Sequence, residues 1–140
     1  MLNIKQLIPQ RSPIMMVDEL LCVNGDEAQC RLAVREDNFF LEEDGLIAEV
    51  GIIEHIAQSA SAFAGYRAVV EEGATEPPVG YIGEVKNFEC YDLPSVGDTV
   101  HTRMEVVAKM ADVTLVQAET SLNGKPTAVC QMKIFIQKIT

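Results

Sequence analysis

The chain has 140 residues and a formal net charge of −10, and 48% of its residues are hydrophobic. This length predicts a single domain over residues 1–140, and this composition can fill a core. The negative charge repels phosphate backbones and anionic membrane surfaces. We therefore expect neither a nucleic acid nor a membrane as a partner.

The four cysteines are Cys22, Cys30, Cys90 and Cys130. None of them form a CxxC pair, which argues against a zinc site, and we expect no metal and no cofactor. We interpret them as buried thiols in a reducing cytosol. The N-terminus lacks the apolar segment of a secretory signal, and the longest apolar stretch contains several charged residues. These features predict a cytoplasmic protein.

A hairpin is predicted near the N-terminus, after one helical turn at Asn3 to Leu7. An extended run covers Ile14 to Val23, and the pair Asn24-Gly25 is typical of a tight hairpin turn. Apolar and polar residues then alternate, which indicates a strand with one buried face. The apolar positions of this strand are Ala28, Cys30, Leu32 and Val34.

One long helix is predicted from about Ile47 to Glu71, and as the central helix of the fold it is expected to cover Val50 to Val70. An acidic loop, Asn38 to Gly45, precedes it, and Gly73 ends it. Small side chains fill the middle of the helix and allow a close approach to another surface. Because little of its surface is purely polar, we expect burial on nearly all sides.

The rest of the chain is predicted to form strands. Their ranges are Val79 to Tyr91, Thr99 to Lys109, Val113 to Leu122 and Thr127 to Ile139, with a second hairpin turn at Asn123-Gly124. Two strands, a long helix and four strands predict an α+β hotdog fold, in which an antiparallel sheet wraps around one central helix. An isolated sheet of this kind leaves an open edge, which predicts a dimer.

Three segments carry a resemblance to a known family. The opening LIPQRSPIMMVDEL, the helix segment VGIIEHIAQSASAFAG and the segment YIGEVKNFECYDLPSVGDTV are similar, in this order, to motifs of the 3-hydroxyacyl-[acyl-carrier-protein] dehydratases. The segment GLIAEVGIIEHIAQSASAFAG resembles more closely a divergent branch, the dehydratase-like proteins of aryl-polyene clusters. The resemblance covers nearly the whole chain, and the helix motif is its most specific part.

The chain also departs from the family pattern. The family places a catalytic histidine in the loop before the helix, where the family spacing reaches Phe40 in this chain. Gln10 replaces the histidine of the opening motif. Of the helix motif, Glu54 and Gln58 remain. The resemblance thus implies an active site that keeps its carboxylate and lacks its histidine.

Removing water from a 3-hydroxyacyl thioester requires a base for the proton beside the carbonyl and an acid for the departing hydroxyl. Glu54, among apolar neighbours early in the helix, is the candidate catalytic residue for this proton transfer. Gln58, four residues later on the same face, is expected to hold the carboxylate. The alternative is that Glu54 points into solvent at the edge of the helix.

Four further residues are candidates for substrate binding: Gly51, Gly83, Phe40 and His55. The resemblance implies that Gly83 lets a strand approach the thioester, and a bulge glycine is a compatible alternative. His55 adjoins Glu54, but neighbours on a helix point about 100° apart. An interface or surface position is therefore the favoured interpretation of His55.

Three functions stay open. The first is a dehydratase acting on acyl thioesters, most simply on acyl carrier protein, with Glu54 as acid/base group. The second is a catalytically incomplete subunit that pairs with a homologous hotdog chain carrying the histidine, so that the dimer is either a homodimer or a heterodimer. The third is a hotdog acyl thioesterase, in which a helix carboxylate activates water. Fold alone decides none of these.

Overall fold

The computed structural model describes residues 3–137. A short 3-10 turn, Ile4–Gln6, precedes strands β1 (Glu19–Asn24) and β2 (Glu27–Ala33). The helix α1 (Glu49–Tyr66) follows and continues into a π-helical turn, η2 (Arg67–Glu71). The last four strands are β3 (Val79–Cys90), β4 (Thr99–Met110), β5 (Val113–Leu122) and β6 (Lys125–Gln137). This element order is the one that the sequence predicts.

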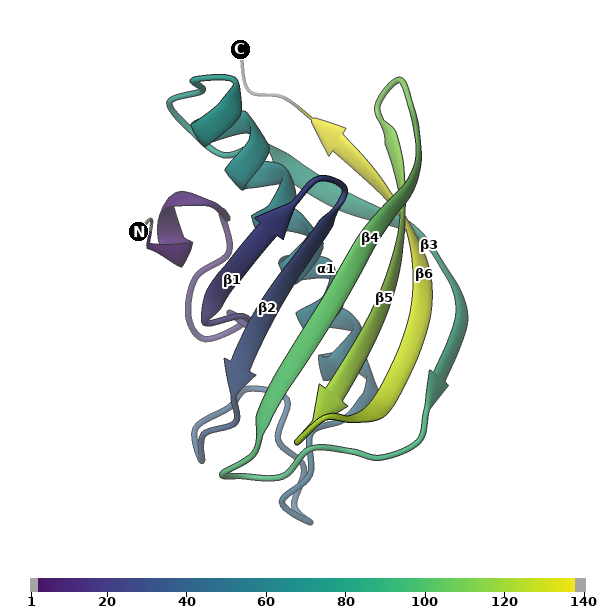
Figure 1. Ribbon diagram of the computed structural model, residues 1–140. Coiled ribbons are helices and arrows are strands. Elements are labelled where there is room, and N and C mark those ends of the chain that lie inside the picture. Colours follow the sequence, from purple (N-terminus) through teal and green to yellow (C-terminus); the bar gives the residue numbers. More distant parts are fainter. Residues whose placement is uncertain (1–2, 138–140) are drawn as a thin grey trace.

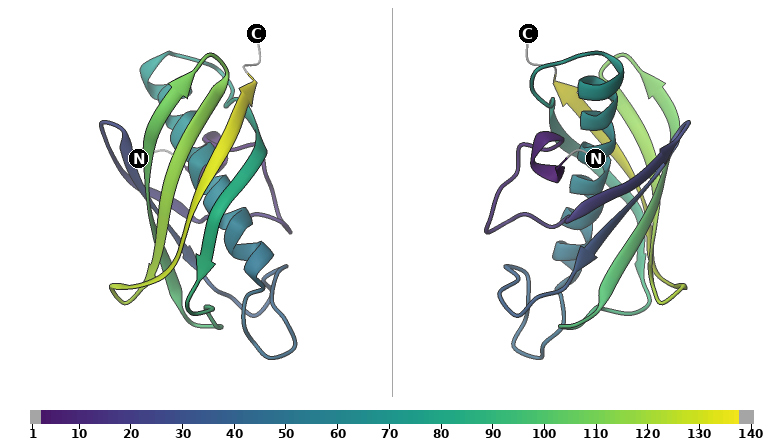
Figure 2. Two further views of the ribbon diagram at one scale, coloured as in Figure 1. Left: turned by 90° about the vertical axis from the view of Figure 1, so that its right-hand side faces the viewer. Right: turned by 60° about the vertical axis from the view of Figure 1, so that its left-hand side comes forward.

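The six strands form one antiparallel sheet in the order β1-β2-β4-β5-β6-β3, so β1 and β3 are its edges. The sheet curves around α1 (Figure 1). The N-terminal segment lies on the side of the helix that the sheet leaves open (Figure 2). It approaches closely there, because a Cβ atom on Gly65 would stand 1.9 Å from the backbone oxygen of Leu7.

Sheet and helix share one apolar core. Ile52, Ile56 and Phe63 of α1 are at most 3% exposed, and inward side chains of the strands, such as Met104 and Met132, close over them. The alternation of buried and exposed residues along β4 and β6 follows the two-residue period of a strand. No helix in the described part of the chain has the length and apolar character needed to span a membrane.

Both predicted hairpin turns are present. The first lies one residue later than its Asn24-Gly25 pair predicts, because Asn24 still pairs in β1 and the turn residues are Gly25, with a φ of 63°, and Asp26. Asn123 and Gly124 join β5 to β6 with φ angles of 52° and 82°. Positive φ at both central residues is the geometry of a type I′ turn, which Asn-Gly favours. The expected end of the last strand, residues 138–139, lies outside the described residues.

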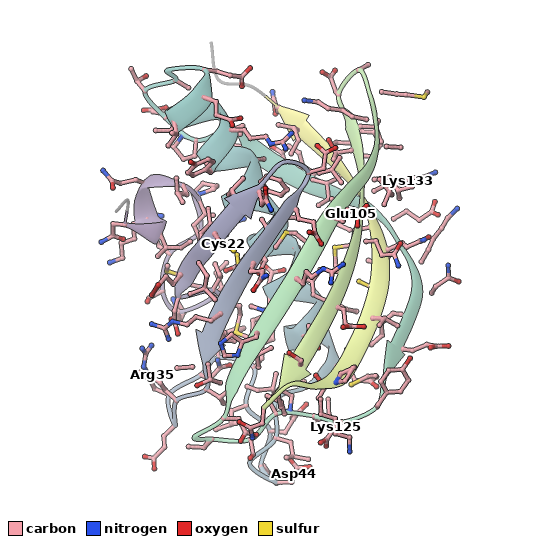
Figure 3. All side chains as sticks on the ribbon, viewed as in Figure 1. Cys22, Arg35, Asp44, Glu105, Lys125 and Lys133 are labelled. Carbon is pink, nitrogen blue, oxygen red and sulfur yellow. The ribbon has the colours of Figure 1, made fainter. Side chains whose placement is uncertain are left out.

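Two expectations need correction. The extended run from Ile14 becomes a sheet strand only at Glu19, because side chains of α1 hydrogen-bond the backbone of Ile14 and Met16 instead. The four thiols are free, but Cys22 is exposed on β1 (Figure 3), so the cysteines are not all buried. Burial raises the pKa of the Cys30 thiol to about 12 and that of Cys130 to about 11.

Candidate functional site

The carboxylate of Glu54 lies on the second turn of α1 and is half-buried. The side-chain amide of Gln58, one turn further along, donates a hydrogen bond from Nε2 to Oε1 of Glu54 over 2.8 Å. This is the contact expected from their spacing of four residues. Glu54 is therefore held at one oxygen and does not extend freely into solvent.

Gln58 is completely buried and uses both ends of its amide. Its Oε1 accepts from the backbone nitrogen of Met16 over 2.5 Å, and its Nε2 also donates to the backbone oxygen of Ile14 over 2.8 Å. Buried polar groups with every partner in place specify one geometry, because any loosening leaves unpaired groups. Gln58 therefore fixes the segment Ile14–Met16 and the Glu54 carboxylate relative to each other.

His55 is also completely buried, so the interface or surface interpretation is wrong. Its Nδ1 lies 2.6 Å from the backbone oxygen of Met16 and its Nε2 lies 2.7 Å from Oγ1 of Thr102 on β4. A carbonyl only accepts, so Nδ1 carries the proton and Nε2 accepts from the threonine hydroxyl. Burial lowers the pKa of His55 to about 4, so the ring is neutral near pH 7.

Phe40 and Gly51 meet at the start of α1. A Cβ atom on Gly51 would stand 2.6 Å from Cβ of Phe40, so the glycine allows the ring to pack against the first turn. Within residues 3–137, no side chain caps this end of the helix, whose N-cap is Ala48. Some backbone N–H groups of the first turn thus lack side-chain partners, and such groups are typical donors to a negatively charged oxygen.

Gly83 lies on the edge strand β3, which packs against α1. The pairing of β3 with β6 shifts register between Ile82 and Glu84, so Gly83 sits at a bulge, as one alternative predicts. A Cβ atom here would stand 2.1 Å from the ring of Phe135 on β6. The ring of Phe135 therefore covers Gly83 from the neighbouring strand and leaves no room for a side chain, which explains the glycine at this position.

The face of α1 that carries Glu54 is only partly covered by this chain. Val50 is 60% exposed, and Ile53 and Ala57 are half-buried. These three residues lie three or four positions from Glu54 or from each other and form one stripe along the helix. Large apolar side chains on β3 are exposed as well, with Tyr81 at 55% and Ile82 at 41%.

The structure thus groups the predicted residues in three places. Glu54 and Gln58 form one hydrogen-bonded pair, and about one turn earlier Phe40, from the loop before α1, packs against Gly51. Gly83 comes from the neighbouring edge strand, whereas His55 points away toward β4. Sequence reasoning missed Thr102, although a polar residue at an inward position of β4 was a usable signal for a buried polar partner.

Known proteins resemble the whole chain. The model of the ApeP-like family, described as ApeP dehydratase, matches residues 2–139. A solved chain of the dehydratase heterocomplex ApeI:P from Xenorhabdus doucetiae is 17% identical, with a TM-score of 0.90 over 99% of this chain and 93% of that chain. A hypothetical thioesterase from Streptococcus pneumoniae, solved with coenzyme A, is 12% identical, with a TM-score of 0.65 over 86% and 88%. These likenesses confirm the hotdog fold.

Proposed function

Since this chain belongs to the ApeP-like dehydratase family, we propose that it serves the dehydration of 3-hydroxyacyl thioesters, with Glu54 as its proton-transfer group. The observation that carries the proposal is the placement of this carboxylate. It is half-buried, it is held at one oxygen by Gln58, and it lies on a helix face that the chain leaves partly open. A carboxylate in this setting is both fixed and accessible to a substrate.

In the proposed reaction, a base removes the proton from C2 of the acyl group and the hydroxyl on C3 leaves as water after it gains a proton. Glu54 supplies one of these two transfers. The open N–H groups at the start of α1, beside Phe40 and Gly51, are positioned to stabilise the enolate oxygen that develops at the thioester carbonyl. Gln58 is a positioning residue, because its amide holds the carboxylate.

A second proton-transfer group is not supplied by either histidine of the chain. His55 is buried and uses both ring nitrogens for Met16 and Thr102. His101 is exposed on β4, next to the inward-facing Thr102, and so lies on the outer face of the sheet, away from α1. We therefore propose that a homologous hotdog subunit completes the site with its own histidine.

Surface features of the chain support such a partner. The stripe around Glu54 is apolar, and the adjacent edge strand β3 has exposed apolar side chains and unpaired backbone groups. If β3 paired with the corresponding edge strand of a second subunit, that subunit would cover both the apolar stripe and the open edge of the sheet. The solved ApeI:P structure is itself a dehydratase heterocomplex, which favours a heterodimer over a homodimer.

Acyl carrier protein remains the proposed carrier of the substrate. Lys86, Arg67 and Arg103 are basic residues at which an acidic carrier could dock, and each has an acidic neighbour. Lys86 pairs with Glu84 at 3.1 Å, Arg67 with Asp26 at 3.2 Å and Arg103 with Glu27 at 2.6 Å. Such surface pairs are weak. An acidic carrier would either displace them or dock on the partner subunit.

The test is a turnover assay with a panel of 3-hydroxyacyl thioesters, using the chain alone and mixed with a histidine-bearing homologue. Glu54→Gln should lower the rate at least about 100-fold, because the amide keeps the shape and cannot transfer the proton. Its thermal stability should equal or exceed that of the parent. The matched control is Glu71→Gln, which changes an exposed carboxylate at the far end of the helical segment.

Each outcome separates the candidate functions. Turnover only in the mixture supports the partner subunit, and turnover by the chain alone supports a self-sufficient dehydratase. Release of free acid instead of the enoyl product would identify a thioesterase. Full activity of Glu54→Gln in every condition would refute the role of the carboxylate.

A further inference from the structure

A cavity of about 310 Å³ lies between the second half of α1 and the sheet. Its helix wall is formed by Ala60, Ala64 and Ala68, which are spaced by four residues and share one face. Its sheet wall is formed by branched apolar side chains, namely Val106, Val116, Ile134 and Ile136. The cavity exists because single methyl groups face the sheet where larger side chains would otherwise fill the space.

The cavity is separate from the candidate active site. The cavity begins at Ala60, which follows Glu54 by six residues, or about 9 Å along a helix. The segment between them is tightly packed, with Ile56, Gln58 and Ser59 completely buried. A ligand could therefore occupy this cavity without contact with Glu54.

Cationic groups line the rim of the cavity. Arg67 uses Nη2 to donate to Asp26 and to the backbone oxygen of Gly25, while its Nε is buried and has no acceptor among the described residues. Lys109 also lines the cavity, and within residues 3–137 it has no ion pair. The acidic residues Glu72 and Asp112 stand at the same rim. The rim can thus receive a charged head group beside an apolar interior.

The backbone beside the rim is unusual. The helix changes to π-helical geometry at Arg67 and keeps it through Glu71. Such turns are rare and occur frequently at functional sites, because they displace side chains from the regular helical positions. This turn carries Arg67 and Ala68, which both line the cavity.

We propose that this cavity binds a linear apolar chain of medium length that ends in a carboxylate, with the chain between the alanine face and the sheet and the carboxylate at Arg67 and Lys109. Protein sites for small molecules begin at about 300 Å³, so a chain of about eight to twelve carbons suits this volume. The site is additional to the dehydratase site and does not depend on the function of Glu54.

The experiment titrates the full chain with decanoate, followed by calorimetry and by methyl NMR. Saturable binding should shift the methyl signals of Val116 and Ile134. Ala64→Leu, which fills the cavity, should weaken binding at least tenfold, whereas Ala108→Leu, the same change at an exposed position outside the cavity, should not. Glu54→Gln should bind decanoate as the parent does.

A second variant and two further ligands complete the experiment. Val106→Phe fills the cavity from the sheet side and replaces Ala64→Leu if that variant does not fold. Decanol and the decanoyl thioester of coenzyme A test the head group, and both should bind at least tenfold more weakly than decanoate. The proposal is overturned by the absence of saturable binding, by equal binding in the filled variants, or by equal binding of decanol. Thioester binding that Glu54→Gln alters would assign the ligand to the other site.

Discussion

The two halves of α1 meet the same sheet in opposite ways. In the first half, His55 and Gln58 are completely buried, and the hydrogen-bonding groups of both side chains have partners. In the second half, Ala60, Ala64 and Ala68 leave a cavity of about 310 Å³. Two halves of one helix in one core thus differ in what fills the space beneath them.

The first half of the helix is held rigidly, whereas the second half borders open volume. Around Glu54, polar side chains of the helix hydrogen-bond the backbone at Ile14 and Met16 and fix the local geometry, which suits the proton-transfer role proposed for Glu54. At the other end, apolar walls and open volume suit a ligand that arrives and leaves. Substitutions in one half of the helix at a time should therefore have different effects.

The largest effect is expected for Gln58→Leu. This change removes the partners of the Met16 nitrogen and the Ile14 oxygen, and it releases Glu54. Loss of the partners of the buried Met16 nitrogen and the part-buried Ile14 oxygen should lower the free energy of unfolding by about 4 kcal/mol. Urea unfolding measures this loss. Gln117→Leu, at an exposed position of β5, is the matched control and should change it by less than about 0.5 kcal/mol.

The next effect is a pH dependence of stability caused by His55, whose pKa falls from 6.5 to about 4 on folding. Between these values the unfolded chain binds the proton and the folded chain does not. Lowering the pH from 6.5 to 4 should therefore reduce the free energy of unfolding by about 3 kcal/mol through this group, whereas its contribution is constant above pH 6.5.

Unfolding curves of His55→Asn and His101→Asn across this pH range isolate that contribution. Carboxylates titrate in all three proteins, so the difference in slope from the parent is the quantity of interest. The slope should become shallower in His55→Asn, and His101→Asn makes the same change at an exposed position as the matched control. Equal slopes in all three proteins would contradict the neutral, buried state of His55.

The smallest effect is a gain in stability from Ala64→Leu in the second half of the helix. The added side chain enters existing space and should raise the free energy of unfolding by about 1 kcal/mol. Thermal unfolding detects this gain, and Ala108→Leu serves again as the control. A clear loss of stability would mean that the space cannot accept a branched side chain and is smaller than described.

Sequence patterns predicted most of the fold, because local rules determine those elements. Alternation predicted the strands from Thr99 to Lys109 and from Val113 to Leu122. Asn-Gly pairs predicted both hairpins, although the first turn lies one residue later, at Gly25-Asp26. The contact between Glu54 and Gln58 followed from helical spacing. In each case the partner lies within the same element or an adjacent one.

Errors arose where the partner is distant in the sequence. His55 was assigned to the surface because nothing nearby shows that Met16 and Thr102 surround it. The run from Ile14 was assigned to a strand because its amino-acid composition does not show what its backbone binds. A segment that hydrogen-bonds to helix side chains and one that pairs with a strand can have the same composition. The small residues in the middle of the helix, among them Ala60 and Ala64, predicted close approach and also fit a cavity, so composition alone could not distinguish the two.

The sheet order has a consequence for how the chain folds. Strands β4, β5 and β6 follow one another and pair in that order, whereas β2 joins β4 across the whole helix and β3 joins β6 across two strands. Pairing between distant segments closes long loops and is slower than pairing between neighbours. The three-stranded meander is therefore expected to form first, and β3 to dock later. The edge that a second subunit would meet is then among the last parts of the chain to be completed, so assembly and the end of folding can occur as one event.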